Sequence, residues 1–346
     1  YEEITEKKYH TMVEELSFLS FRQVKGNEAE IDKFCNNDTC EIDFEQIKEK
    51  QELEEVWLEI GNTPLIKLSD KLYGKLEAIN PGGSIKDRPV KYILDNAFVN
   101  DLIKKGDTII EATSGNTGIS LAMMCAERGY KCIIVMPSDM SIERKKMMSF
   151  FGAELVEVDT GDFDGAIELK CKMAKENGYF ELNQFNNPLN VECHLNTTCK
   201  EILYDTMITD YDSQISAFIA GTGTGGTLMG VQQGFKSHSI NAKIIAVEPA
   251  ESPVMSGGKK GLHGIQGIGD GSKFLVDLDV VDEIIPISTE EAKERALRLA
   301  KENGLFVGIS AGANVLASER WIEQNNPDGI VVTILCDRGE RYFSVL

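Results

Sequence analysis

The chain has 346 residues, of which 42% are apolar and 27% are charged, a composition that is ordinary for a globular protein and excludes a wholly disordered one. The 36 basic residues face 56 acidic ones, so the net charge is −20 and the chain repels phosphate backbones and anionic lipid surfaces. No apolar run approaches the ~18 residues that a membrane helix needs. Neither nucleic acid nor a membrane is therefore an expected partner.

Residues 1–56 differ from the rest of the chain because they are rich in Glu and Lys. The stretches 12–21 and 44–60 have the apolar spacing of amphipathic helices, so a helical N-terminal extension is expected. Cys35 and Cys40 form a C-x4-C pair in a polar stretch, and no second pair stands near it to complete a zinc site. Whether this pair binds anything stays open.

The start of the chain and its cysteines both bear on the compartment. The first residues contain no basic segment followed by an apolar one, so no secretory signal is expected. The eight cysteines are scattered along a long chain, which is typical of proteins that keep reduced thiols. The cytoplasm is therefore the expected location.

From residue 57 onward, apolar runs of strand length alternate with helical stretches. The runs are 107–112, 131–136, 153–158, 179–185, 214–220, 242–248, 282–287, 305–310 and 330–335. The helical stretch 289–304 has a capping box from Ser288 to Glu291 and a terminal glycine, Gly304. This alternation predicts mostly parallel sheets that helices cover on both faces.

The number of strand–helix units exceeds one open sheet of usual size. Two three-layer α/β domains are therefore predicted, over residues 57–187 and 188–346. In such folds a ligand binds at the carboxyl ends of the strands, so a site is expected in the cleft between the domains.

Four glycine-containing segments stand where such a site is expected. They are NPGGSIKDR (80–88), TSGNTG (113–118), GTGTGGT (221–227) and GISAG (308–312). The second and third each join a strand to a helix. Backbone N–H groups at the positive end of a helix make such a junction an anion site.

The segment GTGTGGT permits two interpretations. It matches G-x-G-x-x-G, and Glu248 follows 22 residues after the last glycine of that match, as the ribose-binding acid of a dinucleotide site does. An NAD-dependent oxidoreductase is thus one alternative. The segment also carries Thr222, Thr224 and Thr227, whose hydroxyls suit a single phosphate monoester.

Several motifs together resemble one family. NPGGSIKDR, EATSGNTG, GTGTGGT, HGIQGIG and GISAG, with GNTPLIKL (61–68) and GERY (339–342), follow the order and spacing of the cysteine synthase and cystathionine β-synthase family. The resemblance covers residues 57–346 and leaves the N-terminal extension outside. It implies a tryptophan-synthase-β-like fold, which is fold type II of the pyridoxal-phosphate enzymes, and pyridoxal 5′-phosphate as the cofactor.

The resemblance also implies roles for the residues that would hold this cofactor. Lys86 resembles the lysine that forms the Schiff base and later acts as general base. Asn116 resembles the residue that contacts the ring 3′-oxygen, and Ser310 the serine that faces the pyridine nitrogen. The cup for the 5′-phosphate would consist of Gly223, Thr224, Gly225, Gly226 and Thr227.

A second group resembles the substrate pocket of the family. Its members are Thr113, Ser114, Gly115, Thr117, Gln184 and Gly267. The first five would receive the α-carboxylate of an amino acid, and binding is expected to close the smaller domain over the cofactor. His263 is expected to orient the loop that contains Gly267, and Cys336 to be a structural thiol.

The activity implied by the resemblance is β-replacement on a serine-type amino acid. The first expectation is cysteine synthesis from O-acetylserine and sulfide through an α-aminoacrylate. Two departures from the pattern of the O-acetylserine sulfhydrylases open an alternative. Asp270 replaces a small residue after Gly-Ile-Gly, and Cys336, Asp337 and Arg338 replace Pro-Ser-Ser.

A catalytic carboxylate at Asp270 would act as a general base for water or a thiol and would repel sulfide. The alternative is therefore a cysteine-consuming reaction that releases hydrogen sulfide, as in a cysteine lyase or a cystathionine β-synthase-like enzyme. Homodimerisation and docking of a serine acetyltransferase tail are further implications of the resemblance. A purely partner-binding role is the remaining alternative.

Overall fold

The computed structural model describes residues 59–113, 115–208, 214–269 and 274–345. The expectations for residues 1–56, including the C-x4-C pair, and those for Ser114 and Asp270 lie outside the described residues. In the described part of the chain, no helix combines the length and the apolar character that crossing a membrane requires.

A larger sheet has six strands in the order β1-β2-β10-β7-β8-β9. All neighbours in it are parallel except the antiparallel pair of β1 and β2. Its strands are β1 (Leu65–Lys67), β2 (Leu72–Leu76), β7 (Ile215–Gly221), β8 (Lys243–Pro249), β9 (Glu283–Ile287) and β10 (Ile330–Leu335). The central strand β10 is buried along its whole length, which explains its continuous apolar sequence IVVTIL.

A smaller sheet has four parallel strands in the order β5-β4-β3-β6. Its strands are β3 (Thr108–Ala112), β4 (Lys131–Pro137), β5 (Glu154–Val158) and β6 (Phe180–Glu181). Apolar side chains pack on both of its faces, with Ile109 and Ile134 on one and Ile110 and Val135 on the other. The alternation along the strands supplies both cores.

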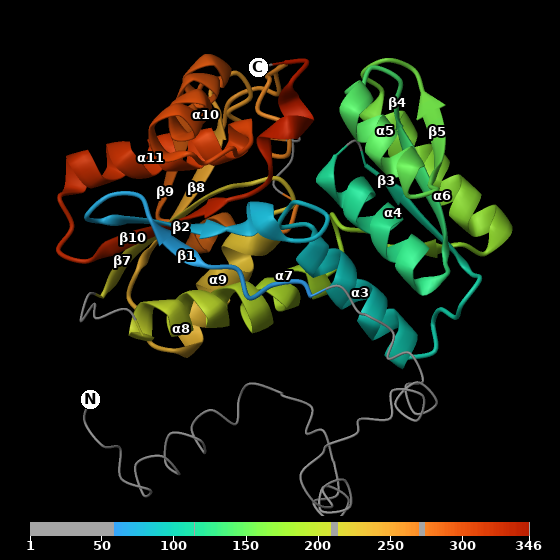
Figure 1. Cartoon of the computed structure of the whole chain (residues 1–346), viewed down its shortest axis with the longest axis horizontal. Coiled ribbons are helices and arrows are strands. Elements are labelled where there is room, and N and C mark those ends of the chain that lie inside the picture. Colours follow the sequence, from blue (N-terminus) through green and yellow to red (C-terminus); the bar gives the residue numbers. More distant parts are fainter. Residues whose placement is uncertain (1–58, 114, 209–213, 270–273, 346) are drawn as a thin grey trace, which may run out of the picture. The chain divides into compact units, whose positions relative to one another are not determined.

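Helices cover both faces of each sheet, as Figure 1 shows. On the larger sheet, α10 (Thr289–Asn303) and α11 (Ile309–Asn325) lie on one face, and α8 (Lys200–Ile208) and α9 (Gly226–Ser237) on the other. On the smaller sheet, the helices are α3 (Asp87–Val99), α4 (Asn116–Arg128) and α5 (Ile142–Phe150) on one face and α6 (Phe163–Asn177) on the other. The predicted fold class of mostly parallel, doubly covered α/β sheets is confirmed.

The remaining short elements connect these layers. They are α7 (Leu189–His194), a π-helical turn η4 (Leu195–Cys199), and the 3-10 turns η3 (Glu77–Ile79), η5 (Leu278–Val280) and η6 (Gly339–Tyr342). The predicted capping box of α10 is present, since Ser288 and Glu291 bond reciprocally. Gly304 ends the helix with φ +68°, a left-handed conformation that favours glycine.

Two features differ from the sequence-based expectation. Strands β1 and β2 join the larger sheet through pairing of β2 with β10, although they precede the strands of the smaller sheet in the chain. The predicted first domain, 57–187, is therefore not built from one sheet alone, and the division at 187 stays a prediction. The run 305–310 is not a strand: Val307 makes one isolated bridge to Arg338, and α11 begins at Ile309.

Candidate active site

A pocket of about 370 Å³ lies where the predicted glycine segments meet. The lining includes every predicted site residue that the structure describes. These are Lys86, Thr113, Gly115, Asn116, Thr117, Gln184, Gly223, Thr224, Gly225, Gly226, Thr227, Gly267 and Ser310. Their segments follow strands of both sheets, so parallel pairing brings residues that are far apart in sequence to one place.

Lys86 stands at the start of α3, at the end of a turn that hydrogen bonds hold closed. Gly83 N donates to Asn80 O at 2.7 Å, and Gly82 N donates to Asp87 Oδ2 at 2.6 Å. The hydroxyl of Ser120 on α4 donates to the other Asp87 oxygen. Burial raises the pKa of Asp87 to about 6, although these donors oppose the shift. The turn therefore fixes the backbone from which the Lys86 side chain enters the pocket.

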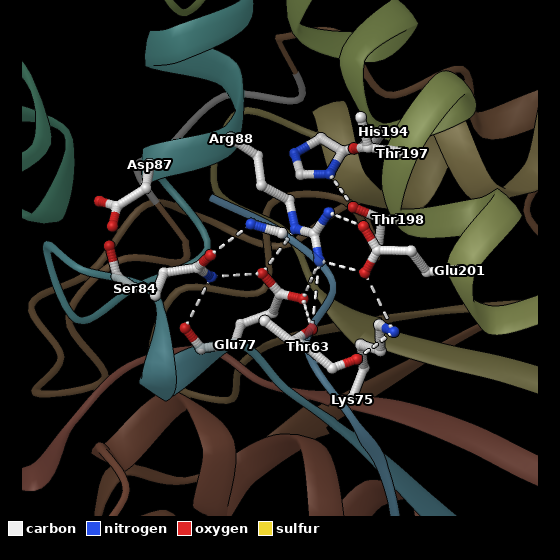
Figure 2. Close-up of polar contacts among 12 residues, drawn as sticks. Thr63, Lys75, Glu77, Ser84, Asp87, Arg88, His194, Thr197, Thr198 and Glu201 are labelled. Atoms are coloured by element: carbon white, nitrogen blue, oxygen red, sulfur yellow. Dashed lines mark hydrogen bonds and ion pairs between the residues drawn. The ribbon is translucent and has the colours of Figure 1, made fainter. Parts of the chain in front are cut away.

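A buried ion-pair network is centred on Arg88, which follows Lys86 by two residues in the chain. The Arg88 guanidinium lies between two carboxylates, those of Glu77 at 2.7 Å and Glu201 at 2.6 Å (Figure 2). Lys75 extends the network, with Nζ 3.1 Å from Glu201 and 2.8 Å from Asp205. Because Glu77 and the Arg88 side chain are almost fully buried, each charge depends on its partners.

The network also shifts the pKa values of Arg88 and Glu201. Burial alone would lower the pKa of Arg88, but Glu77 and Glu201 raise it above its usual value. Burial likewise opposes the charged form of Glu201, yet Arg88 and Lys75 lower its pKa to about 2. Sequence reasoning missed this network. The available signal was the placement of Lys75 and Glu77 within the apolar segment LYGKLEAI.

The loop after β7 is shaped so that only glycine fits at two positions. Gly225 caps α9 with φ +88°, and a Cβ at Gly226 would lie 2.1 Å from Asn190 Oδ1. Asn190 Nδ2 donates to Thr224 Oγ1 at 3.0 Å and fixes that side chain. Thr224 Oγ1 accepts from Gly226 N at 3.3 Å, and among the described residues no other side chain caps the first turn of α9. Its backbone N–H groups and the threonine hydroxyls therefore form an anion cradle at the pocket wall.

His194 on α7 supports this cradle from behind and was not predicted. Its Nε2 lies 3.2 Å from Thr227 Oγ1, and its Nδ1 lies 2.8 Å from Thr198 Oγ1. Burial, helped by the charges of Arg88 and Lys86, lowers the pKa of His194 well below its usual value. The ring is therefore neutral at physiological pH and can serve as both donor and acceptor.

The side-chain amide of Asn116 is held at both ends. Its Nδ2 donates to Asp337 Oδ2 at 2.7 Å, and its Oδ1 accepts from Arg341 Nη1 at 2.5 Å. The hydroxyl of Tyr342 also donates to Asp337 Oδ2, at 2.6 Å. Asp337, one of the residues that differ from the pattern of the O-acetylserine sulfhydrylases, thus positions the pocket residue Asn116. The contact that the resemblance implies between Asn116 and a cofactor ring stays a prediction.

Thr117 and Gln184 join two loops of the smaller sheet. Thr117 Oγ1 donates to Gln184 Oε1 at 2.6 Å. Beneath them, the fully buried Glu111 accepts hydrogen bonds from Ala112 N at 3.0 Å and Gln184 N at 3.3 Å. Burial raises the pKa of Glu111 to about 7, and Lys170 and the backbone donors only partly oppose the shift.

This shift predicts a pH-dependent stability. Because the pKa of Glu111 rises from 4.5 to about 7 on folding, the folded state holds this proton more tightly, and the free energy of unfolding falls as the pH rises through that window. The contribution is at most roughly 3 kcal/mol. We expect Glu111→Gln to flatten the fall of the unfolding free energy with pH, as measured by urea unfolding. A smaller slope of the same sign remains, because the pKa of Asp87 is also raised on folding. An unchanged profile would contradict the assignment, and the exposed Glu302→Gln is the control.

The remaining candidates include Cys336, Ser310 and His263. Burial raises the pKa of Cys336 to about 12, so its thiol stays protonated at neutral pH, as expected for a structural thiol. Ser310 is buried in the first turn of α11 and faces the same pocket. His263 Nε2 lies 3.0 Å from Gly269 O, a contact that fits the predicted role in shaping the loop around Gly267.

Glu248, the acidic residue that the dinucleotide alternative requires for ribose binding, is engaged by other groups in this structure. Glu248 is 1% exposed, and its carboxylate accepts from Met255 N at 2.8 Å and from the backbone and hydroxyl of Ser256. These bonds commit the carboxylate to a loop of the protein. A ribose hydroxyl would have to displace them, so the NAD interpretation is not supported.

Comparisons with known proteins agree with this site. The family model described as pyridoxal-phosphate dependent enzyme matches residues 56–337. A cysteine synthase of Staphylococcus aureus is 43% identical over 296 residues, which span 82% of this chain and 94% of that protein. The cysteine synthase structure from Entamoeba histolytica is 42% identical, with a TM-score of 0.76 over 83% of this chain and 88% of that one.

Another solved structure is similar to the same degree. A hydrogen sulfide-producing enzyme from Fusobacterium nucleatum is 40% identical, with a TM-score of 0.77 over 82% of this chain and 97% of that one. The pocket residues also fit the cofactor that the family model names. A lysine at the start of α3 opens on the same pocket as a cradle at the N-terminus of α9, where an added Cβ at Gly226 would fill the space beside Asn190. The chain belongs to the pyridoxal-phosphate dependent enzyme family, and its cofactor is pyridoxal 5′-phosphate.

Proposed function

We propose that this protein is a cysteine synthase, which replaces the acetoxy group on Cβ of O-acetylserine with sulfide and releases acetate. The convergence of Lys86, the α9 cradle and the segment 113–117 on one pocket carries this proposal. The 43% identity to a cysteine synthase over most of both chains supports the choice of substrates.

The cofactor, when bound, supplies an electron sink beside the substrate Cα. Lys86 Nζ is proposed to hold the cofactor, to take the proton from Cα once its amine is released, and to return a proton when the product leaves. Such a base must be neutral when it acts.

The other pocket residues bind and orient. The cradle Gly223–Thr227 is proposed to receive the phosphate, and neutral His194 orients the Thr227 hydroxyl within it. Ser310 faces the pyridine nitrogen in this proposal. A serine there does not hold that nitrogen protonated as an aspartate would, so proton removal couples to departure of the Cβ substituent.

The amino-acid substrate is proposed to bind with its α-carboxylate over the N-terminus of α4. Thr113, Ser114, Gly115 and Thr117 would receive the α-carboxylate together with Gln184, whose Oε1 Thr117 already fixes. Gly267 would border the Cβ side of the substrate. Closure of the smaller sheet and its helices over the pocket would exclude water from the reaction.

A product assay tests the proposal. Wild-type holoenzyme receives three mixtures: O-acetylserine with sulfide, serine with homocysteine, and cysteine alone. We expect cysteine from the first mixture at the highest rate. Sulfide release from cysteine that exceeds cysteine formation from O-acetylserine would contradict the proposal.

Sulfide release from cysteine is the rival function. Two observations favour it: the residue Asp270 and the similarity to a hydrogen sulfide-producing enzyme of Fusobacterium nucleatum. A carboxylate there would serve as a general base for water or a thiol. For a sulfide-releasing enzyme we expect Asp270→Ala to take up sulfide faster and to lose sulfide release from cysteine. If Asp270→Ala changes neither the rate of sulfide uptake nor that of sulfide release, Asp270 has no part in the mechanism and the rival function loses its support.

We also propose that the protein is a cytoplasmic homodimer and that the C-terminal tail of a serine acetyltransferase docks in the pocket described here. A carboxylate at the end of a peptide suits the donors around Gly115 as the substrate carboxylate does. Light scattering of the purified protein tests the dimer. Competition between a tail peptide and amino-acid substrate tests the docking.

A further inference from the structure

Arg144, near the start of α5, is a buried cation that forms no ion pair with the described residues. Its side chain is 3% exposed and contributes to the lining of the pocket. The buried Nε and Nη2 atoms have no hydrogen-bond partner, and among the described residues no carboxylate oxygen lies within 4 Å of the guanidinium. The group lies over the ring of Tyr342, 5.2 Å from its centroid. Burial of an uncompensated charge is costly, which points to a functional reason.

Two acidic residues, Glu143 and Asp337, accept hydrogen bonds from groups other than Arg144. Glu143, the preceding residue, accepts from the backbone and hydroxyl of Ser344. Asp337 accepts through Oδ2 from Asn116 and from the hydroxyl of the same Tyr342. In the described part of the chain, neither carboxylate pairs with Arg144. The positive charge is therefore available to a ligand in the pocket.

The guanidinium adjoins a second positive feature, the N-terminus of α4. A Cβ built on Gly115, the N-cap residue, would lie 3.8 Å from Arg144 Nη1. Among the described residues, no side chain accepts from the N–H groups of Asn116 and Thr117 in the first turn of this helix. The cation and the helix end thus converge on one wall of the pocket, where a small anion would satisfy both.

We propose that Arg144 is the charged component of the site for the α-carboxylate of the amino-acid substrate. A single carboxylate matches a single unpaired guanidinium in charge and in its forked geometry. The phosphate of the cofactor has its own cradle at α9, built from other residues. This inference rests on the proposed function, because it takes the ligand of the α4 turn to be an amino acid.

The test uses holoenzyme and two probes that carry no Cβ leaving group, L-alanine and its methyl ester. Titration of the visible absorbance of the cofactor gives a dissociation constant for each. We expect the wild type to bind alanine more tightly than the ester. In Arg144→Met we expect alanine binding to weaken about 10- to 100-fold while ester binding stays constant.

Arg144→Lys keeps the charge but not the fork, and it decides the matter if the methionine variant does not fold. We expect it to weaken alanine binding by a smaller factor and to leave ester binding unchanged. The control is Arg295→Met, since Arg295 is also buried but pairs with Glu319 outside the pocket lining. Alanine affinity that is unchanged in the Arg144 variants overturns the inference.

The two proposals fail in different ways. If wild-type protein forms cysteine but the Arg144 variants keep the preference for alanine over its ester, only the inference about Arg144 is wrong. If the wild type does not distinguish alanine from its ester, the substrate carboxylate is not bound by charge, and the inference falls with that result. Failure of cysteine formation in the product assay, with alanine bound as expected, contradicts the proposed function alone.

Discussion

Lys86→Ala is expected to lower kcat/KM for cysteine formation by about 10⁴-fold or more. The substitution removes both the anchor for the cofactor and the amine proposed to take the Cα proton, and general-base catalysis alone contributes about 10²- to 10⁴-fold. Cofactor bound by the α9 cradle can remain, because the residues of that cradle are separate from Lys86. Steady-state assays with O-acetylserine and sulfide measure the loss.

The matched control is Lys243→Ala, which removes an exposed lysine that pairs with Asp282 at the N-terminal end of β8, outside the pocket lining. It is expected to leave kcat/KM unchanged. Lys86→Arg, which keeps a positive charge but supplies no neutral amine at physiological pH, is expected to be as inactive as the alanine variant. Turnover above a hundredth of the wild-type rate in either Lys86 variant would refute the assignment of Lys86.

Arg88→Met is expected to cost about 3–5 kcal/mol of the free energy of unfolding. The variant keeps the bulk of the side chain but leaves Glu77 and Glu201 without the guanidinium that binds each of them through two hydrogen bonds. Lys75 reaches only Glu201 of these two, so Glu77 becomes a buried carboxylate without a cation. Urea unfolding monitored by circular dichroism measures the change.

Arg298→Met offers a contrast, because that exposed arginine pairs with Glu302 at the protein surface. No measurable loss of stability is expected there. A second arm, Arg88→Met with Glu77→Gln, removes the unpaired charge and is expected to recover part of the loss. A single variant as stable as the wild type would mean that the network contributes nothing to the fold around Lys86.

Local sequence patterns predicted the segments that contain the site. The glycine loops, the capping box at Ser288 and the position of Lys86 depend on residues close together in the chain, where turn and helix-cap chemistry decides the backbone. Parallel strands then bring the ends of these segments to one edge of a sheet. For this reason each described member of the predicted site lines one pocket.

Contacts between distant residues were not predictable in the same way. Asn116 meets Asp337 across 221 positions, and Arg88 meets Glu201 across 113. No periodicity in a single sequence encodes such pairs. Pairing of β2 with β10 is equally long-range and places the first strands in the larger sheet.

The prediction of a strand over residues 305–310 was wrong for a local reason. The run 305–310 is apolar, like a buried strand, but Gly308 N donates to Asp337 O and α11 begins at the next residue. The apolar residues there serve the core beneath α11 instead of a sheet. A short apolar run does not distinguish a buried strand from the start of a buried helix.

Borohydride reduction of wild-type holoenzyme, followed by peptide mapping, tests the central claim most directly. We predict a yellow protein whose visible absorption band disappears on reduction, with the mass of the reduced cofactor on the peptide that contains Lys86. A colourless protein that takes up no added pyridoxal 5′-phosphate, or a label confined to another lysine, would contradict the claim.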